Sequence, residues 1–370
     1  MRLRIVLACL AVAMAVPSAA RAETDALHVR VLGELDQFTA WLDQYNVKGY
    51  VGEVGWPDDY NGDATKWNAL AEEWFQRADA AGLWVTVWAT GEWWGDYKLG
   101  IYESSPNYGP VNSANTQASV LEGHLNRRRG VSDAGGEFGN IDAIAPTNDT
   151  FSNKEPGTYN TDYHYDSQAS FDYLALRGVR LVRIPFRWER IQAEPGGPLR
   201  KSEVTRLQGA IDRAGAAGLE VVLDMHNYGG YYRDSNGTGV RCPVGQPGCT
   251  VAEFADVWRR IARRLGGAPV TAYGIMNEPV ALKKVGDLSP VRVWRKASRA
   301  AVSAIRGTGD NTIVSVPGYF WSTLRDWTSW NPKPWVNDDR IVYEAHHYWD
   351  TDSSGYYTLS YDDEVAAASG

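Results

Sequence analysis

The predicted fold is decided by two stretches of the sequence, Tyr50-Val-Gly-Glu-Val-Gly-Trp-Pro57 and Tyr273-Gly-Ile-Met-Asn-Glu-Pro279. Each stretch ends an apolar run of strand length and places a glutamate at the carboxyl end of that strand. In a barrel of parallel strands, the residues at the carboxyl ends of the strands build one common face. We therefore expect the two glutamates, Glu53 and Glu278, to meet on that face although they lie far apart in the chain.

Strand-like runs alternate with helical patterns, which is typical of an α/β fold with a parallel sheet. The eight predicted strands are 49–55, 83–89, 130–134, 181–186, 220–226, 271–277, 312–317 and 340–346. The predicted helices are 35–45, 64–80, 167–177, 201–216, 251–265 and 291–305. This pattern predicts a (β/α)8 TIM barrel. The alternative is an open doubly wound sheet, but no Gly-x-Gly-x-x-Gly motif follows the first predicted strand.

The amino terminus has the pattern of a signal peptide. Arg2 and Arg4 precede an apolar run, 5–16, that is too short to span a bilayer, and small residues at 18–22 offer a cleavage site. A membrane anchor is the alternative, which the length of the run disfavours. We expect that residues 1–22 are removed, that the protein is secreted and that 23–370 form a single catalytic barrel domain.

Composition narrows the class of partner. Loss of residues 1–22 changes the formal net charge from −8 to −11. An acidic surface disfavours nucleic acid and anionic membranes as partners, whereas a neutral partner is unaffected by it. The chain has 16 Trp and 20 Tyr, several of them beside glycine and polar residues, which favours flat aromatic platforms for sugar rings. We expect a carbohydrate substrate and a monomer.

Glu53 and Glu278 are the predicted catalytic pair. Cleavage of a glycosidic bond with retention needs one carboxyl that protonates the leaving oxygen and a second that attacks the anomeric carbon. The strand context and Pro279 suit Glu278 to the first role, and the glycines that flank Glu53 suit it to the second. The alternatives are a glutamate at the start of a helix and a glutamate in a surface turn.

Further candidates lie at other strand ends. Arg183 lies within a buried run and is expected to pair with the nucleophile, or else to form a purely structural ion pair. Three histidines at strand ends also fit a zinc hydrolase, but that interpretation leaves both glutamate motifs unexplained. The predicted substrate-binding residues are Arg183, His226, Asn227, Asn277, His346, Tyr348, Trp88 and Glu137. Weaker candidates for aromatic platforms are Trp56, Trp188, Tyr228, Trp321 and Trp349.

Two cysteines remain after loss of the signal peptide, which contains Cys9. Cys242 and Cys249 enclose a loop that is rich in proline and glycine, and in an exported protein this spacing predicts a local disulfide. A metal site would need more ligands than this loop offers. We therefore expect no metal and no cofactor.

A set of eight residues resembles the active site of glycoside hydrolase family five, the cellulase family of clan A. The set is Arg183, His226, Asn277, Glu278, His346, Tyr348, Glu53 and Trp88. The resemblance implies that Glu278 is the acid/base, that Glu53 is the nucleophile and that the other six line the subsite between them. It also implies a retaining β-glycosidase, first of all an endo-β-1,4-glucanase. Exo-acting or oligosaccharide-specific β-glycosidases, mannanases, xylanases, transglycosylases and a non-catalytic carbohydrate-binding barrel remain alternatives.

The order of the motifs departs from the family. An ordinary member has the Asn-Glu-Pro motif on strand four and the nucleophile on strand seven, whereas Glu53 precedes Glu278 in this chain. The order indicates a circular permutation in which the chain begins before the family's strand seven and ends after its strand six. Chain ends are tolerated on exposed loops. The permutation predicts that residues 23–31 and 364–370 approach each other in space.

Overall fold

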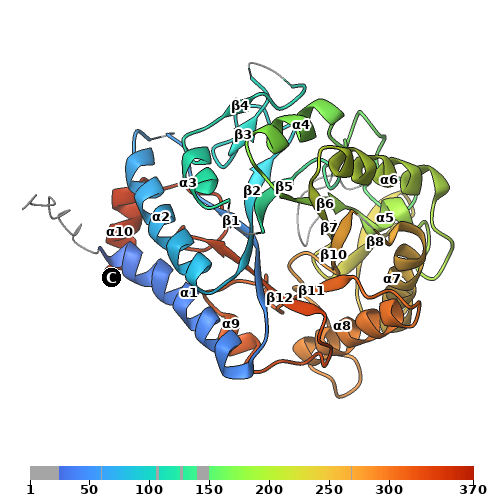
Figure 1. Ribbon diagram of the computed structural model, residues 1–370. Coiled ribbons are helices and arrows are strands. Elements are labelled where there is room, and N and C mark those ends of the chain that lie inside the picture. The colour runs from blue at the N-terminus through green and yellow to red at the C-terminus, as the bar shows by residue number, and fades with distance from the viewer. Residues whose placement is uncertain (1–24, 60, 106–107, 126–127, 140–149, 268) are drawn as a thin grey trace, which may run out of the picture.

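The computed structural model describes residues 25–370 except for 60, 106–107, 126–127, 140–149 and 268. Eight parallel strands close into one barrel, which confirms the predicted fold (Figure 1). Their order around the barrel is β1-β12-β11-β10-β7-β6-β5-β2. The strands are β1 (Gly49–Gly55), β2 (Trp84–Thr90), β5 (Arg129–Asp133), β6 (Leu181–Phe186), β7 (Glu220–Met225), β10 (Val270–Gly274), β11 (Ile313–Pro317) and β12 (Ile341–Tyr348). The predicted signal peptide lies outside the described residues.

Helices surround the barrel (Figure 1). The long ones are α1 (Ala26–Tyr45), α2 (Ala64–Ala80), α4 (Gln168–Leu176), α6 (Lys201–Ala216), α7 (Val251–Leu265) and α8 (Pro290–Arg306). The short ones are α3 (Ala118–Gly123), α5 (Trp188–Ile191), α9 (Trp327–Trp330) and α10 (Tyr361–Ala368). The helix predicted from residue 35 begins nine residues earlier, where the side chain of Asp25 accepts a hydrogen bond from the backbone N–H of His28 and caps the helix. Among the described residues, no helix has both the length and the apolar character that crossing a bilayer requires.

Two antiparallel hairpins were not predicted from the sequence. One consists of β3 (Tyr102–Glu103) and β4 (Ser113–Ala114), and the other of β8 (Gly230–Ser235) and β9 (Thr238–Pro243). In the second hairpin, Asn236 and Gly237 form the turn with φ of 56° and 84°. Asn-Gly favours the tight turn whose twist matches that of a hairpin, so the signal was present in the sequence.

The barrel closes between the beginning and the end of the chain. Strand β1 pairs with β12 on one side and with β2 on the other, and Glu53 lies beside His346 in the register of β1 and β12. Outside the barrel, the hydroxyl of Tyr361 in α10 lies 2.9 Å from a carboxylate oxygen of Asp25 and 2.9 Å from Nδ1 of His28. The charge of Arg30 in α1 also acts on Glu364 in α10, so the start of the predicted segment 364–370 lies near residues 25–31.

The disulfide predicted between Cys242 and Cys249 is not formed, and both residues are free thiols. A hydrogen bond to Cys249 lowers the pKa of Cys242. Burial is the main reason why the pKa of Cys249 is raised well above its ordinary value. The two cysteines lie close enough to share a hydrogen bond, and the predicted disulfide between them is not confirmed.

The barrel interior changes from apolar to charged along its axis. Near the amino ends of the strands, side chains of β1, β6, β7, β10 and β12 form a buried apolar cluster, namely Tyr50, Leu181, Val222, Ala272 and Val342. Toward the carboxyl ends, the fully buried side chains include Arg183, Asp224 and Glu344. Charges are costly to bury without partners, so this end of the barrel must supply paired groups.

Candidate active site

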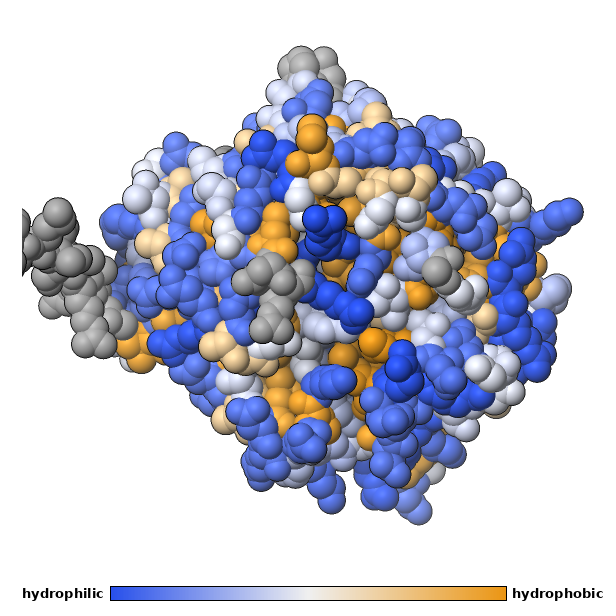
Figure 2. Space-filling view, viewed as in Figure 1, coloured by the Kyte–Doolittle hydropathy of each residue, from blue (hydrophilic) through white to orange (hydrophobic). Residues whose placement is uncertain are grey.

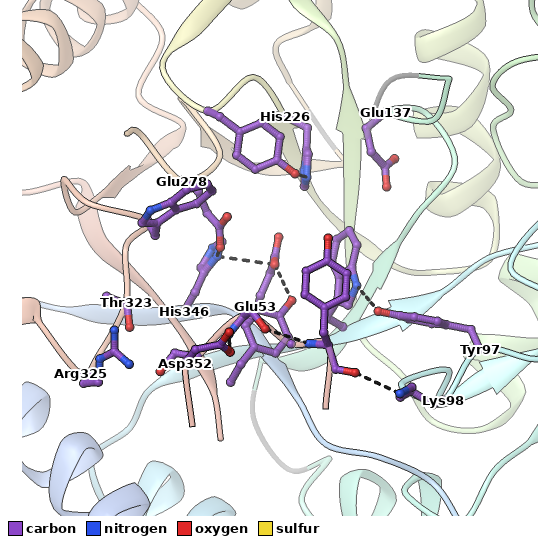
Figure 3. Close-up of a pocket in the computed structure, with 18 of the residues that line it drawn as sticks. Glu53, Tyr97, Lys98, Glu137, His226, Glu278, Thr323, Arg325, His346 and Asp352 are labelled. Carbon is purple, nitrogen blue, oxygen red and sulfur yellow. Dashed lines mark hydrogen bonds and ion pairs between the residues drawn. The ribbon is translucent and has the colours of Figure 1, made fainter. Parts of the chain in front are cut away.

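A cavity of about 800 Å³ opens at the carboxyl ends of the strands (Figure 3). Seven of the predicted site residues line it, namely Glu53, Trp88, Glu137, His226, Glu278, His346 and Tyr348. The surface seen in Figure 2 is mostly hydrophilic, with apolar patches near the middle of the face. The cavity therefore combines charged and aromatic walls, as a site for a polar ring-shaped ligand requires.

Glu53 is held by three neighbours. Arg183 donates from Nη1 to one carboxylate oxygen over 2.8 Å, and the hydroxyl of Tyr348 donates to the other over 2.7 Å. Nδ1 of His346 lies 3.6 Å from that second oxygen. Burial would raise the pKa of Glu53, but the positive charges of His346 and Arg183 outweigh it and the pKa is lowered. Glu53 is therefore an ionised carboxylate.

Glu278 follows β10 and adopts a left-handed backbone conformation with φ of 42°, which is uncommon for a residue with a side chain. Its Oε1 lies 2.8 Å from Nδ1 of His346. Burial raises the pKa of Glu278, and the nearby charge of Glu53 adds to this effect against the influence of His346. The pKa values of the two carboxyls thus move in opposite directions, which is the arrangement that separates an acid from a nucleophile.

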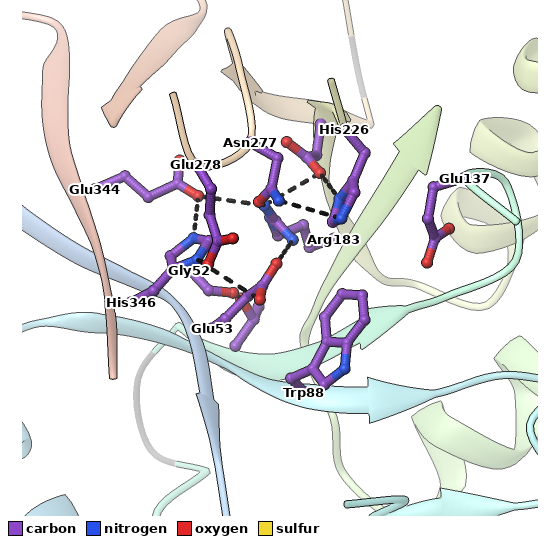
Figure 4. Close-up of polar contacts among 12 residues, drawn as sticks. Gly52, Glu53, Trp88, Glu137, Arg183, His226, Asn277, Glu278, Glu344 and His346 are labelled. Carbon is purple, nitrogen blue, oxygen red and sulfur yellow. Dashed lines mark hydrogen bonds and ion pairs between the residues drawn. The ribbon is translucent and has the colours of Figure 1, made fainter. Parts of the chain in front are cut away.

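Arg183 lies beneath the carboxyls and is fully buried (Figure 4). Besides Glu53, its guanidinium donates to Oδ1 of Asn277 over 2.6 Å and lies 3.1 Å from Asp224. Nδ2 of Asn277 lies 3.1 Å from Nε2 of His226, whose other ring nitrogen lies 2.8 Å from Asp224. These contacts join residues from β6, β7 and β10 into one network under the cavity.

Aromatic rings lie on more than one side of the cavity. Trp88, at the end of β2, stacks on His226 with ring centroids 5.7 Å apart, and its indole N–H donates to Tyr97 over 3.2 Å. The peptide bond after Trp88 is cis. Tyr228 and Trp321, which follow β7 and β11, also line the cavity. The other three weaker platform candidates, Trp56, Trp188 and Trp349, are buried in the core.

The position of Asn227 differs from the sequence prediction that it binds substrate. It was predicted to bind substrate with its neighbour His226, but its side chain is 1% exposed and does not line the cavity. Its oxygen accepts from the backbone of Trp188 and its amide donates to Glu189 over 2.9 Å. Successive side chains of an extended segment point to opposite sides, so His226 and Asn227 cannot both face the cavity.

Several cavity residues were missed by the sequence analysis. Trp94, Tyr97 and Phe138 follow β2 and β5, and Phe320 follows β11. Segments that follow barrel strands build the active face, and this rule applied to Gly91–Gly100 would have found the first two. Arg325 and Asp352 add charged groups at the rim, as Figure 3 shows.

Two groups of described residues have ligand atoms within 4.8 Å of one another, as a metal site would require. They are Glu53 with Glu278 and His346, and Glu92 with His164 and Asp166. In both groups each ring nitrogen of the histidine already contacts an oxygen atom. Hydrogen bonding accounts for both arrangements, and we assign a metal to neither.

Comparison with known proteins identifies relatives of this chain. The manganese dependent endoglucanase Eg5A of Phanerodontia chrysosporium is 29% identical over 196 residues, which are 50% of this chain and 47% of that protein. The structure of endoglucanase Cel5A from Pseudomonas stutzeri is 35% identical and matches 62% of this chain and 64% of that chain with a TM-score of 0.50. The endo-beta-1,4-glucanase Xac0029 from Xanthomonas axonopodis pv. citri is 28% identical and matches 65% and 72% of the two chains, also with a TM-score of 0.50.

The chain spans about half the length of the curated relatives that it matches. A family model, Cellulase (glycosyl hydrolase family 5), matches residues 143–369, which include Glu278 and His346 but not Glu53. The structure brings Glu53 to these residues from outside the matched segment. Because the match extends over more than half of the chain, this protein belongs to the cellulase family, glycosyl hydrolase family 5.

Proposed function

We propose that the protein is a retaining glycosidase that hydrolyses internal bonds of a β-1,4-glucan. The observation that carries this proposal is the catalytic pair itself. Carboxyl oxygens of Glu53 and Glu278 lie within 4.8 Å of each other and both contact His346. Retaining enzymes place the two carboxyls about 5–5.5 Å apart, whereas inverting enzymes need about 6.5–9.5 Å to admit a water molecule.

In the first step, Glu278 donates its proton to the glycosidic oxygen as the bond from that oxygen to the anomeric carbon breaks. Glu53 attacks the anomeric carbon and forms a covalent ester, while Arg183 and Tyr348 hold its carboxylate in place. In the second step, Glu278 is a carboxylate and takes a proton from water. The water oxygen then displaces Glu53 from the sugar with overall retention.

The positions of the aromatic residues support internal cleavage. Trp88 and Tyr97 come from β2 and the segment after it, which lie on one side of β1 in the barrel order. Trp321 follows β11, on the other side of the strand that carries the nucleophile, and Tyr228 follows β7, which lies directly opposite β1 in the closed barrel. Aromatic faces bind sugar rings, so these residues offer stacking surfaces on both sides of the cleaved bond. The similarity to an endo-beta-1,4-glucanase supports β-1,4-glucan as the substrate.

A substrate panel and a rescue experiment together test this function. We expect the protein to lower the viscosity of soluble β-1,4-glucan rapidly, because internal cuts shorten chains faster than terminal cuts. Glu278→Ala should lower the hydrolysis of substrates with poor leaving groups by about 10²–10⁴-fold, since the acid is lost. With an activated aryl glycoside, azide should restore turnover of Glu278→Ala and give the β-glycosyl azide, whereas Glu53→Ala with azide should give the α-glycosyl azide.

The exposed Glu73→Ala variant is the control and should retain full activity. Azide products of the same anomeric form from both variants would contradict the assigned roles. If the protein hydrolyses only mannan or only xylan, that glycan and not β-1,4-glucan is the substrate. Release of short products without loss of viscosity would indicate exo action. Sugar products longer than the substrate would indicate transglycosylation. Binding without turnover would indicate a carbohydrate-binding barrel.

Glu137 is proposed to bind a sugar hydroxyl remote from the cleaved bond. It lies across the cavity from Glu278 (Figure 3) and is 3% exposed. One carboxyl oxygen accepts the backbone N–H of Gly135 over 2.9 Å, and the other has no hydrogen-bond partner among the described residues. Burial raises the pKa of Glu137 to about 7, so the protonated form, which can donate to a sugar oxygen, is well populated at neutral pH.

Aryl glycosides of increasing length test this role. In Glu137→Ala, kcat/KM should fall about tenfold, the equivalent of one hydrogen bond of about 1.4 kcal/mol, for glycosides long enough to reach residue 137. The shortest glycosides should be unaffected. Glu137→Gln, which keeps a donor and an acceptor, should lose less. Equal losses at every length would contradict the assignment.

We propose that the chain is a circular permutant of the family order. The family match begins at residue 143 and contains β6, β7, β10, β11 and β12, while β1, β2 and β5 precede it. Strands β1 and β2 complete the barrel next to β12 and supply Glu53 and Trp88. The contact between α1 and α10 supports the proposal, because it places the two chain ends where a loop would join them.

A reordered gene tests the permutation. A chain that runs from Arg128 to Gly370 and continues from Asp25 to Leu125, and so keeps the buried His124, restores the order of the family. We expect it to fold with a stability change of about 1 kcal/mol or less, since loop-closure entropy depends weakly on loop length. Denaturant unfolding and kcat/KM measure the outcome. Opening the chain within β6 is the control and should prevent folding, and the same failure in the reordered chain would contradict the proposal.

Export is proposed from residues 1–22, with their basic start and apolar run. The secreted protein should have the mass of residues 23–370, measured by mass spectrometry of the culture medium. Retention of the full chain in the cell membrane would indicate an anchor instead.

A further inference from the structure

A third glutamate lies beneath the catalytic pair. Glu344 belongs to β12 and is fully buried. Its Oε1 lies 3.2 Å from Nε2 of His346 and 3.4 Å from Nη2 of Arg183, and its Oε2 accepts the hydroxyl of Ser315. Glu344 does not line the cavity, so the mechanism above gives it no contact with substrate. It nevertheless touches two residues that bind the catalytic carboxyls (Figure 4).

The contacts of His346 fit a doubly protonated ring. One ring nitrogen faces Glu344 and the other faces Glu278 over 2.8 Å, and a neutral imidazole carries only one N–H. Burial opposes the charge, but Glu53, Glu278 and Glu344 outweigh it and raise the pKa of His346 to about 10. The ring is therefore an imidazolium throughout the neutral range.

Gly52 shows that β1 is shaped around Glu344. A Cβ atom at this position would lie 2.2 Å from Oε1 of Glu344, far inside van der Waals contact. Any side chain would displace the carboxylate or push β1 away from it. Because Gly52 precedes Glu53, the position of Glu344 is coupled to that of the nucleophile.

We propose that Glu344 is a positioning residue that orients His346 and Arg183 toward the catalytic carboxyls. Residue 52 is glycine because the carboxylate of Glu344 occupies the space beside β1. The inference rests on the proposed function, in which Glu53 and Glu278 are the reacting groups. The charged and titratable groups that act on His346 come from β1, β7, β12 and the segments after β7 and β10, and they are Glu53, Asp224, Glu344, His226 and Glu278. Arg183 of β6 contacts two of them, Glu53 and Glu344.

The direction in which Glu344 shifts the pKa of His346 follows from the charge of the carboxylate. A negative carboxylate stabilises the protonated ring, so its removal lowers the pKa of His346. In Glu344→Gln, the ring should therefore lose its second proton at a lower pH than in the unmodified protein. Loss of that proton weakens the hold on Glu278 and Glu53, since the neutral ring can no longer donate from both nitrogens.

Nitrogen-15 NMR of histidine side chains measures this directly and does not require activity. We expect one imidazolium signal, removed by His346→Asn, that persists to about pH 9 in the unmodified protein and titrates at lower pH in Glu344→Gln. The kcat of Glu344→Gln should fall about 10- to 100-fold, the equivalent of a hydrogen bond to a charged group, with a smaller change in KM. Glu344→Asp keeps the negative charge, so its imidazolium signal should persist to a higher pH than that of Glu344→Gln.

Glu189→Gln is the matched control. Glu189 is also fully buried and lies 3.7 Å from Arg187, and its hydrogen bonds go to Asn227 and the backbone of Tyr232, not to His346. We expect it to lower stability without altering the signal or kcat. Gly52→Ala should reproduce the effects of Glu344→Gln, and the double variant should add little, because both changes disturb one carboxylate.

An imidazolium signal that is unchanged in both Glu344→Gln and Gly52→Ala would overturn the proposal. So would a loss of kcat in Glu344→Gln no larger than that in Glu189→Gln. If the unmodified protein hydrolyses none of the β-glycans, the proposed function fails on its own, and the NMR titration still decides whether Glu344 controls the protonation of His346.

Discussion

The buried guanidinium of Arg183 is the constraint on which the site depends. An arginine keeps its charge even when fully buried, so the barrel must supply anions around it. Glu53 and Glu344 supply them at distances of 2.8 and 3.4 Å, and Asp224, whose pKa burial raises to about 8, adds a carboxyl oxygen at 3.1 Å. Breaking one such buried pair is strongly destabilising because it leaves an uncompensated charge. The guanidinium therefore gathers carboxylates at one end of the barrel and fixes the nucleophile among them.

Gathering carboxylates has an electrostatic consequence. Negative groups packed in one dry site repel one another, so not all of them can remain ionised. His346 relieves this repulsion by placing a positive ring between Glu53, Glu278 and Glu344. Glu53 has two cations as neighbours and stays ionised, while burial dominates at Glu278 and favours its proton. The positions of the neighbouring cations thus determine which of the two glutamates is the nucleophile and which is the acid.

The sequence predicted those parts of the site that follow from the length, alternation and ends of the strands. Strand length and alternation located all eight barrel strands, and strand ends located Glu53 and Glu278. The prediction failed at Asn227 because adjacency in sequence was taken for adjacency in space. The same alternation would have found Glu344, since residues 344, 346 and 348 share one side of β12. The burial of Cys249 could not be predicted from spacing, because it depends on packing from distant segments.

The order of the strands places an unusual demand on folding. Glu53 and Tyr348 are 295 residues apart in the chain, yet their hydrogen bond spans the seam where β1 meets β12. In an order that joined β12 to β1 directly, the same contact would be local. Loop-closure entropy grows only with the logarithm of length, so the equilibrium cost of this long closure is modest, about 0.6 kcal/mol for each doubling. Folding rates depend more strongly on sequence separation, because distant contacts must form before they stabilise the chain. The active site is thus complete only when β1 pairs with β12, so catalytic activity requires closure of the whole barrel.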